Sequence, residues 1–456
     1  MPDPDHAVSL EEQIDRWRSY LRRRQAIHSV DVAELEDHLR EQIAVLADAG
    51  LATDEAFLIA VKRMGDLDSL SREFAREHSD RLWKQLVVSP ADSGERSGWA
   101  RREAIVAFFL ATLAALAVKA PELFGLTLDE DSGFYARNAS LFVFPLLAGY
   151  FVWKRGSDRA PLRWLAAAFV AAAVFANVYP FAPEGSTEIL TAMHLPIALW
   201  VVVGVAYAGG RWGDAEVRMD FIRFSGELFI YYVLIALGGG VLTGFTALLF
   251  QAIGVDIEPF FERWMLPCGA LGAVVIASWL VEAKQSVIEN MAPVLTRLFT
   301  PMFALVLIAY LATMTWMGRG IGFQRDILIA FDLLLVVVLG LLLYSISARD
   351  PRASRNLFDV MQIVLVISAL LVDAMALWSI AARISELGFT PNRVAALGEN
   401  VILLVNLAWS AMLYVRFLRG RGPFTDLERW QTNYLPVYGV WAAMVFVVFP
   451  PLFGYI

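Results

Sequence analysis

From about residue 103 to the end, the sequence gathers its apolar residues into blocks of roughly 17 to 25 residues, separated by short polar loops. A helix needs about 20 apolar residues to cross about 30 Å of hydrocarbon, and a helix satisfies its backbone polar groups within one segment. We therefore expect an all-α, polytopic membrane bundle of about eleven spans. The spans are predicted near residues 103–121, 138–153, 162–181, 189–208, 224–253, 264–281, 299–317, 327–347, 357–382, 395–416 and 435–454.

The first 88 residues differ from the rest because they are charged throughout and contain no long apolar run. Ser9 and Glu12 have the spacing of a helix capping box, and apolar residues then recur at helical spacing to about residue 86. Residues 1–88 are therefore predicted to form a small soluble domain of four helices, of which the second runs from near Asp31 to Gly50 and the third from Thr53 to Gly65. Residues 89–102 have linker composition, and the membrane domain is predicted to occupy residues 103–456. The N-terminus lacks the apolar stretch of a signal peptide, so we expect the small domain in the cytoplasm.

The distribution of basic residues among the loops predicts the orientation of the chain. With residues 1–88 inside, the even-numbered loops contain sixteen Lys and Arg residues and the odd-numbered loops contain six. Because basic residues accumulate in cytoplasmic loops, the N-terminus is predicted in the cytoplasm and the C-terminus outside.

Composition argues against several classes of protein. Hydrophobic residues make up 58% of the chain and charged residues only 18%, which is too apolar for a soluble enzyme. The net charge of −8 argues against binding to nucleic acid. Cys268 is the only cysteine and the five histidines are scattered, so no Cys/His metal site is predicted. The sequence has no phosphate-binding loop, zinc-protease motif or nucleophile elbow, and we expect neither an enzyme nor a cofactor.

Polar residues inside the predicted spans are the main functional candidates, because such residues are costly in hydrocarbon. Most of them are predicted near the outer leaflet, which favours a polar cavity that opens outward. The alternative is pairing between helices that serves only assembly, for instance of Lys119 with Asp332 or Asp373. His194 is either a proton sensor, since imidazole titrates near neutral pH, or a hydrogen-bonded packing residue. The candidates are Lys119, His194, Glu227, Asp332, Asp373, Glu399, Asn400 and Asn406.

The fifth predicted span, residues 224–253, is longer than the hydrocarbon is thick and contains a run of glycines. One interpretation is a broken helix, as transporters use to present half-helix ends to a ligand. The other is a tilted, continuous helix whose glycines permit close packing. The glycines concerned are Gly238, Gly239, Gly240 and Gly244.

Two stretches resemble known families. Residues 33–40 (AELEDHLR), with Gly50 and the EAF run at 55–57, resemble the helical permease prefix domain, and this resemblance covers about residues 10–80. Residues 224–227 (FSGE) and 383–393 (RISELGFTPNR) resemble the bacterial polytopic family called domain of unknown function 4153, over residues 103–456. The resemblance implies a bacterial cytoplasmic-membrane protein and supplies no activity.

The run at 383–393 joins the ninth and tenth predicted spans on the outer side. Its charged residues favour a fixed structural network, and the alternative is a site for an anionic headgroup or solute. Gly388 is expected to shape the turn, and Thr390 or Asn392 to cap the following helix. The motif consists of Arg383, Glu386, Gly388, Thr390, Asn392 and Arg393.

Two functions are consistent with these patterns. The first is a permease-like or transporter-like protein that moves a small solute, with residues 1–88 as a cytoplasmic regulatory module. The second is a membrane sensor or scaffold that signals through residues 1–88 to a protein partner. A transporter is expected to have a continuous polar path and a broken fifth span, and a sensor to have a sealed bundle. The lipid bilayer is the partner that both share.

Overall fold

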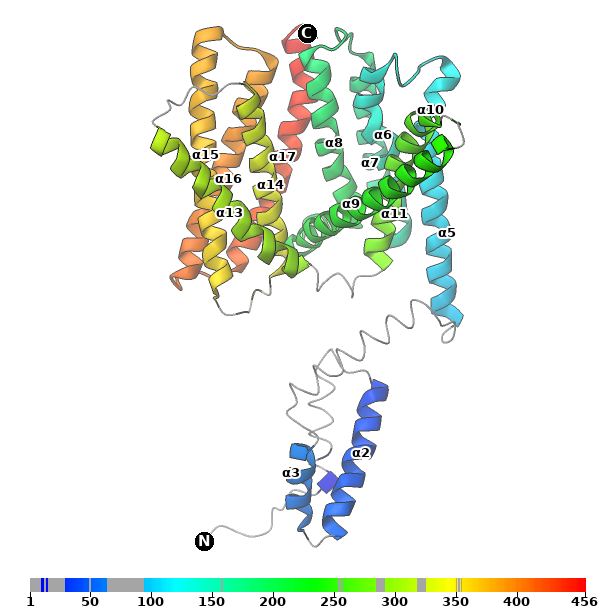
Figure 1. Ribbon diagram of the computed structural model, residues 1–456, viewed down its shortest axis with the longest axis vertical. Coiled ribbons are helices and arrows are strands. Elements are labelled where there is room, and N and C mark those ends of the chain that lie inside the picture. Colours follow the sequence, from blue (N-terminus) through cyan, green and yellow to red (C-terminus); the bar gives the residue numbers. More distant parts are fainter. Residues whose placement is uncertain are drawn as a thin grey trace. The chain divides into compact units, whose positions relative to one another are not determined.

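Figure 1 shows the computed structural model of the chain. It describes residues 10, 11, 14, 29–48, 51–63, 94–156, 159–252, 255, 257–283, 292–317, 325–349, 351, 353 and 355–456. Every regular element in these ranges is a helix, which agrees with the predicted all-α class. The chain divides into two compact units, Met1–Ser97 and Gly98–Ile456.

The first unit contains helices α2 (Ser29–Asp48) and α3 (Thr53–Arg63). Leu39 and Ile43 of α2 are buried against Ala56 and Ala60 of α3, and Ile14 joins the same apolar cluster. The helices agree with the second and third predicted helices of this domain. The predicted fourth helix and the capping residues Ser9 and Glu12 lie outside the described residues.

In the second unit a helix lies at each of the eleven predicted spans. Among the described residues, nine helices are long and apolar enough to cross a membrane. α6 is not among those nine, and the apolar part of α7, Leu162–Val178, is shorter. The eleven helices are α5 (Gly94–Ala117), α6 (Ser132–Arg155), α7 (Arg159–Val178), α8 (Ser186–Tyr207), α9 (Ala215–Ala252), α11 (Leu266–Ala283), α13 (Ala292–Met317), α14 (Arg325–Ala348), α15 (Leu357–Leu387), α16 (Pro391–Leu418) and α17 (Thr425–Leu452).

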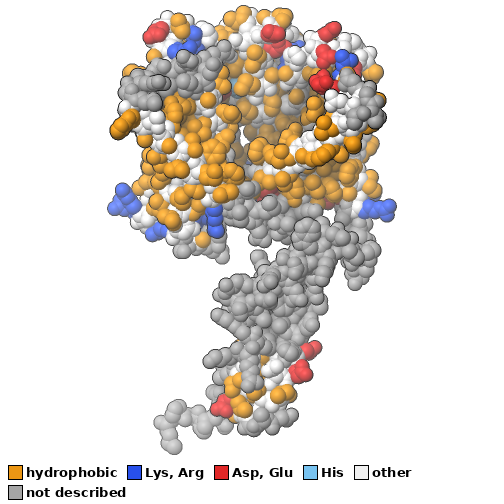
Figure 2. Space-filling model, in the orientation of Figure 1, with side chains coloured by type: hydrophobic (Ala, Val, Ile, Leu, Met, Phe, Trp, Pro, Cys, Tyr) orange, Lys and Arg blue, Asp and Glu red, His pale blue; other side chains and the backbone are white. Residues whose placement is uncertain are grey.

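Three short helical elements lie in the connections between α5 and α6 and between α9 and α11. They are η1 (Ala120–Phe124), α10 (Glu258–Phe260) and the π-helical turn η2 (Phe261–Met265). Figure 2 shows hydrophobic side chains over the middle of the visible face of this unit and charged side chains near its two ends. This distribution is that of a protein whose middle contacts lipid and whose ends contact water.

Two apolar cores hold the second unit together. α13, α14, α15 and α16 form one core, and α6, α7, α8 and α11 form the other. The start of α9 contributes to both, with Met219 and Ile222 in the first and Phe221 and Phe224 in the second. α8 and α17 pack closely against each other and join the two groups of helices.

Helix α9 agrees with the continuous interpretation of the fifth predicted span and not with the broken one. It is a continuous helix of 38 residues that runs obliquely across the bundle in Figure 1. A Cβ atom built on Gly238, Gly239, Gly240 or Gly244 would meet nothing within 4 Å, so these glycines do not mediate close packing either. The physical reason for continuity is that a break among apolar residues leaves backbone polar groups without partners.

Candidate functional site

Histidine and glutamate side chains meet between α8 and α16. His194 is buried at 2% exposure, and its Nε2 lies 2.5 Å from Oε1 of Glu399. The Nδ1 atom lies 2.8 Å from the Leu190 carbonyl oxygen, which can only accept, so Nδ1 carries a proton. The Nε2 contact therefore requires one further proton, held either by the imidazole or by the Glu399 carboxyl.

The neighbouring residue on α16 extends this polar group toward α14. Asn400 is fully buried and donates from Nδ2 to Oδ1 of Asp332 over 2.9 Å and to the Ala396 carbonyl oxygen over 2.8 Å. Consecutive residues on a helix point about 100° apart, at 3.6 residues per turn. Glu399 and Asn400 can therefore contact different helices from one turn of α16.

Asp373 on α15 lies at the buried end of this group. Its side chain is fully buried, and neither carboxyl oxygen has a hydrogen-bond partner among the described residues. Asp332 interacts electrostatically with both Asp373 and Glu399. An unpartnered buried carboxylate is costly. Such a group is therefore stable only as the protonated, neutral acid or with a cation bound to it.

We call the five residues on these four helices the intramembrane polar row. The Glu399 side chain is 35% exposed, whereas Asp373 is inaccessible, so the row runs from the protein surface into the core. Every member of the row except Asn400 can gain or lose a proton. The row consists of His194, Glu399, Asn400, Asp332 and Asp373.

The structure does not bring Lys119 to this row, so the suggested pairing of Lys119 with Asp332 or Asp373 is wrong. Its Nζ instead lies 2.5 Å from Oε1 of Glu122, one helical turn away, and 4.7 Å from the centre of the Trp264 ring. A carboxylate three residues along the chain is within reach of the lysine without any contact between distant helices. Lys119 thus belongs to the connection between α5 and α6 rather than to the row.

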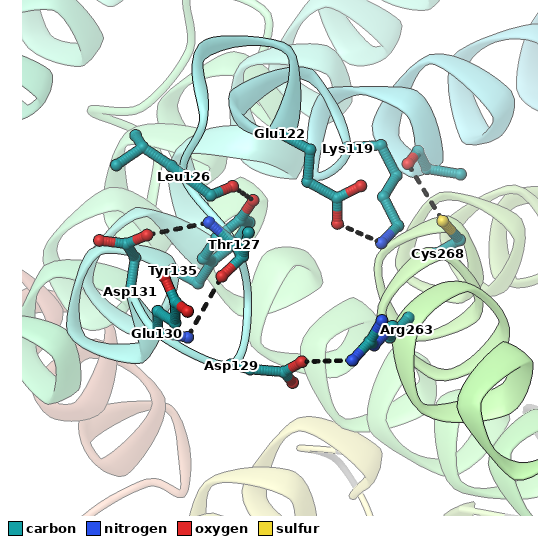
Figure 3. A network of polar contacts seen from close by, with 11 residues as sticks. Lys119, Glu122, Leu126, Thr127, Asp129, Glu130, Asp131, Tyr135, Arg263 and Cys268 are labelled. Atoms are coloured by element: carbon teal, nitrogen blue, oxygen red, sulfur yellow. Dashed lines mark hydrogen bonds and ion pairs between the residues drawn. The ribbon is translucent and has the colours of Figure 1, made fainter.

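Figure 3 shows the polar network of this connection. Arg263 of η2 pairs with Asp129 over 3.1 Å, and the Cys268 thiol donates to the Ala115 carbonyl oxygen over 3.3 Å. The Tyr135 hydroxyl donates to the Leu126 carbonyl oxygen over 2.9 Å. These contacts fasten the loop between α5 and α6 to the start of α11, which is a structural role.

The other two intramembrane candidates also lie apart from the row. Asn406 is seven residues beyond Glu399, about 10 Å at the rise of an α-helix. It exchanges hydrogen bonds with Gln431 over 3.0 Å and donates to the Tyr438 hydroxyl over 2.9 Å. Glu227 is buried near the start of α9, where it lines a cavity.

The outer-loop motif forms a capped helix–turn–helix. α15 ends at Leu387, Gly388 follows with φ +76°, and the Thr390 hydroxyl accepts from the backbone N–H of Arg393 over 3.4 Å. Thr390 is therefore the cap, as expected. The Arg393 guanidinium donates to the carbonyl oxygens of Leu387 and Gly388 over 3.0 and 2.8 Å, which satisfies the end of α15.

The remaining motif residues show which contacts replace the predicted charge network around Arg393. Asn392 does not cap the helix, and its amide donates to the Ser186 hydroxyl over 3.1 Å. Arg383 and Glu386 lie in the last two turns of α15. The Arg393 contacts are to backbone rather than to Glu386, so the motif fixes the turn through capping.

Sequence reasoning missed a charged cavity at the end of the bundle where α9 begins. The cavity has a volume of about 240 Å³ and draws its lining from the ends of α6, α8 and α11 and the start of α9. The signal was present in the sequence as charges of both signs at the ends of these segments. The arginines entered only the count of loop charges that predicts orientation, and Glu227 was a candidate by itself, without the residues around it. The charged lining residues are Arg155, Arg211, Asp220, Arg223, Glu227 and Glu282.

No group of three or more His, Cys, Asp or Glu residues able to hold a metal ion occurs in the part of the chain that the structure describes. Comparisons with protein-family models, curated proteins and solved structures found no match.

Proposed function

We propose that the chain is a permease-like integral membrane protein that moves a small solute together with protons. The observation that carries this proposal is the intramembrane polar row, in which the unpartnered carboxyl of Asp373 interacts electrostatically with Asp332, and Asp332 with the partly exposed Glu399. Ionisable groups in apolar surroundings are typical of proton relays in pumps and transporters. A chain of such groups that begins at the surface suits the uptake and release of a proton.

The proposed topology has eleven spans in a bacterial cytoplasmic membrane, with α6 and α7 crossing in addition to the nine longer apolar helices. The N-terminus lies in the cytoplasm and the C-terminus outside. Residues 1–88 act as a regulatory domain of the permease prefix type. The excess of basic residues in the even-numbered loops and the resemblance of residues 33–40 to that domain support this arrangement.

The test is proton-linked uptake by the full chain in vesicles loaded with a pH-sensitive dye. Amino acids, sugars, carboxylates and amines are added singly under an imposed membrane potential. At least one is expected to acidify the lumen, and Asp373→Asn and Asp332→Asn are each expected to abolish that signal. Asp37→Asn is the matched control, because Asp37 is an exposed aspartate on α2 of the other unit. Acidification that persists in both row variants would remove the row from the mechanism.

The second candidate is a membrane sensor that signals through residues 1–88 to a protein partner. The continuity of α9 favours it, because a broken helix at this position was the feature expected of a transporter. In that case no solute in the panel acidifies the vesicles, and a partner is expected to bind the N-terminal unit.

A further inference from the structure

The charged cavity at the start of α9 is lined by groups of both signs in equal number. Arg155, Arg211 and Arg223 provide three guanidinium groups, and three carboxylates complete the charged lining. Glu227 and the Glu282 side chain are almost fully buried, at 4% and 3% exposure. If the ion pairs among these charges are longer than normal hydrogen bonds, their donors and acceptors remain able to bind a ligand.

Two ion pairs between lining residues of this cavity are long, although Glu282 also pairs with Lys154 at 3.0 Å and Arg223 also donates to the Ser347 carbonyl oxygen over 3.0 Å. The Arg155 guanidinium lies 3.3 and 3.5 Å from the two carboxyl oxygens of Glu282, and Arg223 lies 3.7 Å from Asp220. A well-formed charge-assisted N–H···O bond measures about 2.7–2.9 Å. The Arg349–Asp359 pair at the same end of the bundle reaches that range, at 2.8 Å.

Among the three arginines of the lining, Arg211 has the most hydrogen-bond donors available for a ligand. It lies in the turn after α8 and is exposed, and its side chain has no ion pair or hydrogen bond to the rest of the described chain. The ring of Tyr207 beside it is already covered by Arg155, whose guanidinium lies 4.7 Å from the ring centre. Arg211 can therefore turn toward a ligand without breaking a contact.

We propose that this cavity binds a small zwitterion, with its anionic group on the arginines and its ammonium group on Glu227 and Asp220. An ion of one sign would be attracted by half of the lining and repelled by the other half, whereas a zwitterion satisfies both halves. The volume of about 240 Å³ lies below the roughly 300–1,000 Å³ of sites for drug-sized ligands, so the ligand is small. Either a free amino acid or the headgroup of an aminophospholipid carries these charges.

Equilibrium binding to the full chain in detergent tests the proposal. L-Serine and O-phosphoethanolamine are the zwitterionic probes, and acetate and ethylammonium, at matched ionic strength, are the singly charged halves. Both zwitterions are expected to bind saturably, and both halves far more weakly. The inference does not depend on proton-linked transport, because it is measured without a gradient. Comparable binding of acetate or ethylammonium, or no binding of either zwitterion, would overturn it.

Two variants locate the binding in the cavity. Arg211→Gln is expected to weaken both zwitterions about ten-fold, as the loss of one charge-assisted hydrogen bond predicts. Arg419→Gln is the matched control, because Arg419 is an exposed arginine in the turn that follows α16. Glu227→Gln is expected to weaken the zwitterions as well, by removing the partner of the ammonium group. Affinities unchanged in Arg211→Gln and Glu227→Gln would refute the assignment.

Membranes of two compositions identify the source of the ligand. In nanodiscs of phosphatidylglycerol, O-phosphoethanolamine is expected to bind as in detergent. If its binding disappears when phosphatidylethanolamine is included, the lipid headgroup occupies the cavity. If the binding is equal in both membranes, the site serves a soluble zwitterion.

Discussion

At the scale of single residues, Asp373 combines full burial with two carboxyl oxygens that lack partners in the described structure. Asp359, on the same helix, is buried to a similar degree but receives hydrogen bonds from Arg349 over 2.8 and 3.0 Å and from the backbone N–H of Asn356 over 3.0 Å. The two aspartates are equally buried, and they differ in the hydrogen-bond donors around the carboxyl group. Only Asp373 lacks a partner for its carboxyl among the described residues.

This difference predicts opposite effects of one substitution. Asp373→Leu is expected to increase the free energy of unfolding by about 1–3 kcal/mol, because it removes an unsatisfied buried polar group. Asp359→Leu is expected to decrease it by about 3–5 kcal/mol, because it leaves the Arg349 guanidinium without its partner. Unfolding in mixed detergent micelles measures both. A loss of stability in Asp373→Leu comparable to that in Asp359→Leu would mean that the Asp373 carboxyl has a structural partner.

How far the row could be predicted depends on the residue. The cost of a polar group in hydrocarbon identified His194, Asp332, Asp373, Glu399 and Asn400 as candidates from the sequence alone. The partners could not be predicted in the same way. His194 and Glu399 are 205 positions apart, and nothing in either neighbourhood specifies the other. Lys119 pairs with Glu122, one turn away. The cost of a buried charge does not predict whether its partner lies on the same turn or on a distant helix.

At the scale of elements, the length of apolar blocks predicted the positions of the helices in the second unit, whereas the glycine run in α9 left open whether that helix is broken or continuous. Glycine costs roughly 0.5–1 kcal/mol relative to alanine inside a helix, which is less than the cost of leaving backbone groups unsatisfied in lipid. The helix therefore continues. No residue in the most apolar stretch of α9 is buried, so packing does not hold these glycines in place.

A pair of substitutions on α9 tests its continuity. Gly239→Ala is expected to increase the free energy of unfolding by about 0.5–1 kcal/mol, since the added Cβ meets only open space and alanine is the better helix former. Gly226→Ala on the same helix is expected to decrease it by about 1–3 kcal/mol, because the added Cβ would overlap the Tyr344 ring. The same unfolding measurement applies. Destabilisation by Gly239→Ala would indicate that the run adopts a conformation that only glycine permits.

At the scale of the whole molecule, the sequence predicted where helices lie along the chain but not which helices are neighbours. α8, for example, is apolar around its circumference, so its sequence favours no face for packing. Its contacts with α6, α16 and α17 emerge only in the fold. The number of crossings is a further property of the whole molecule. It depends on α6 and α7, whose apolar parts are less long or less apolar than those of the other nine.

Labelling of single cysteines can decide whether α6 and α7 cross the membrane. Cys268→Ala first removes the only cysteine. Glu130→Cys and Glu184→Cys then report the loops before α6 and after α7, and Asp158→Cys, outside the described residues, reports the loop between them. With eleven spans, an impermeant thiol reagent on intact cells is expected to label the first two and to reach Asp158→Cys only after permeabilisation. Asp214→Cys, beyond α8, serves as the inside control. If all three loops react from outside, α6 and α7 do not cross, and the nine longer helices alone span the bilayer.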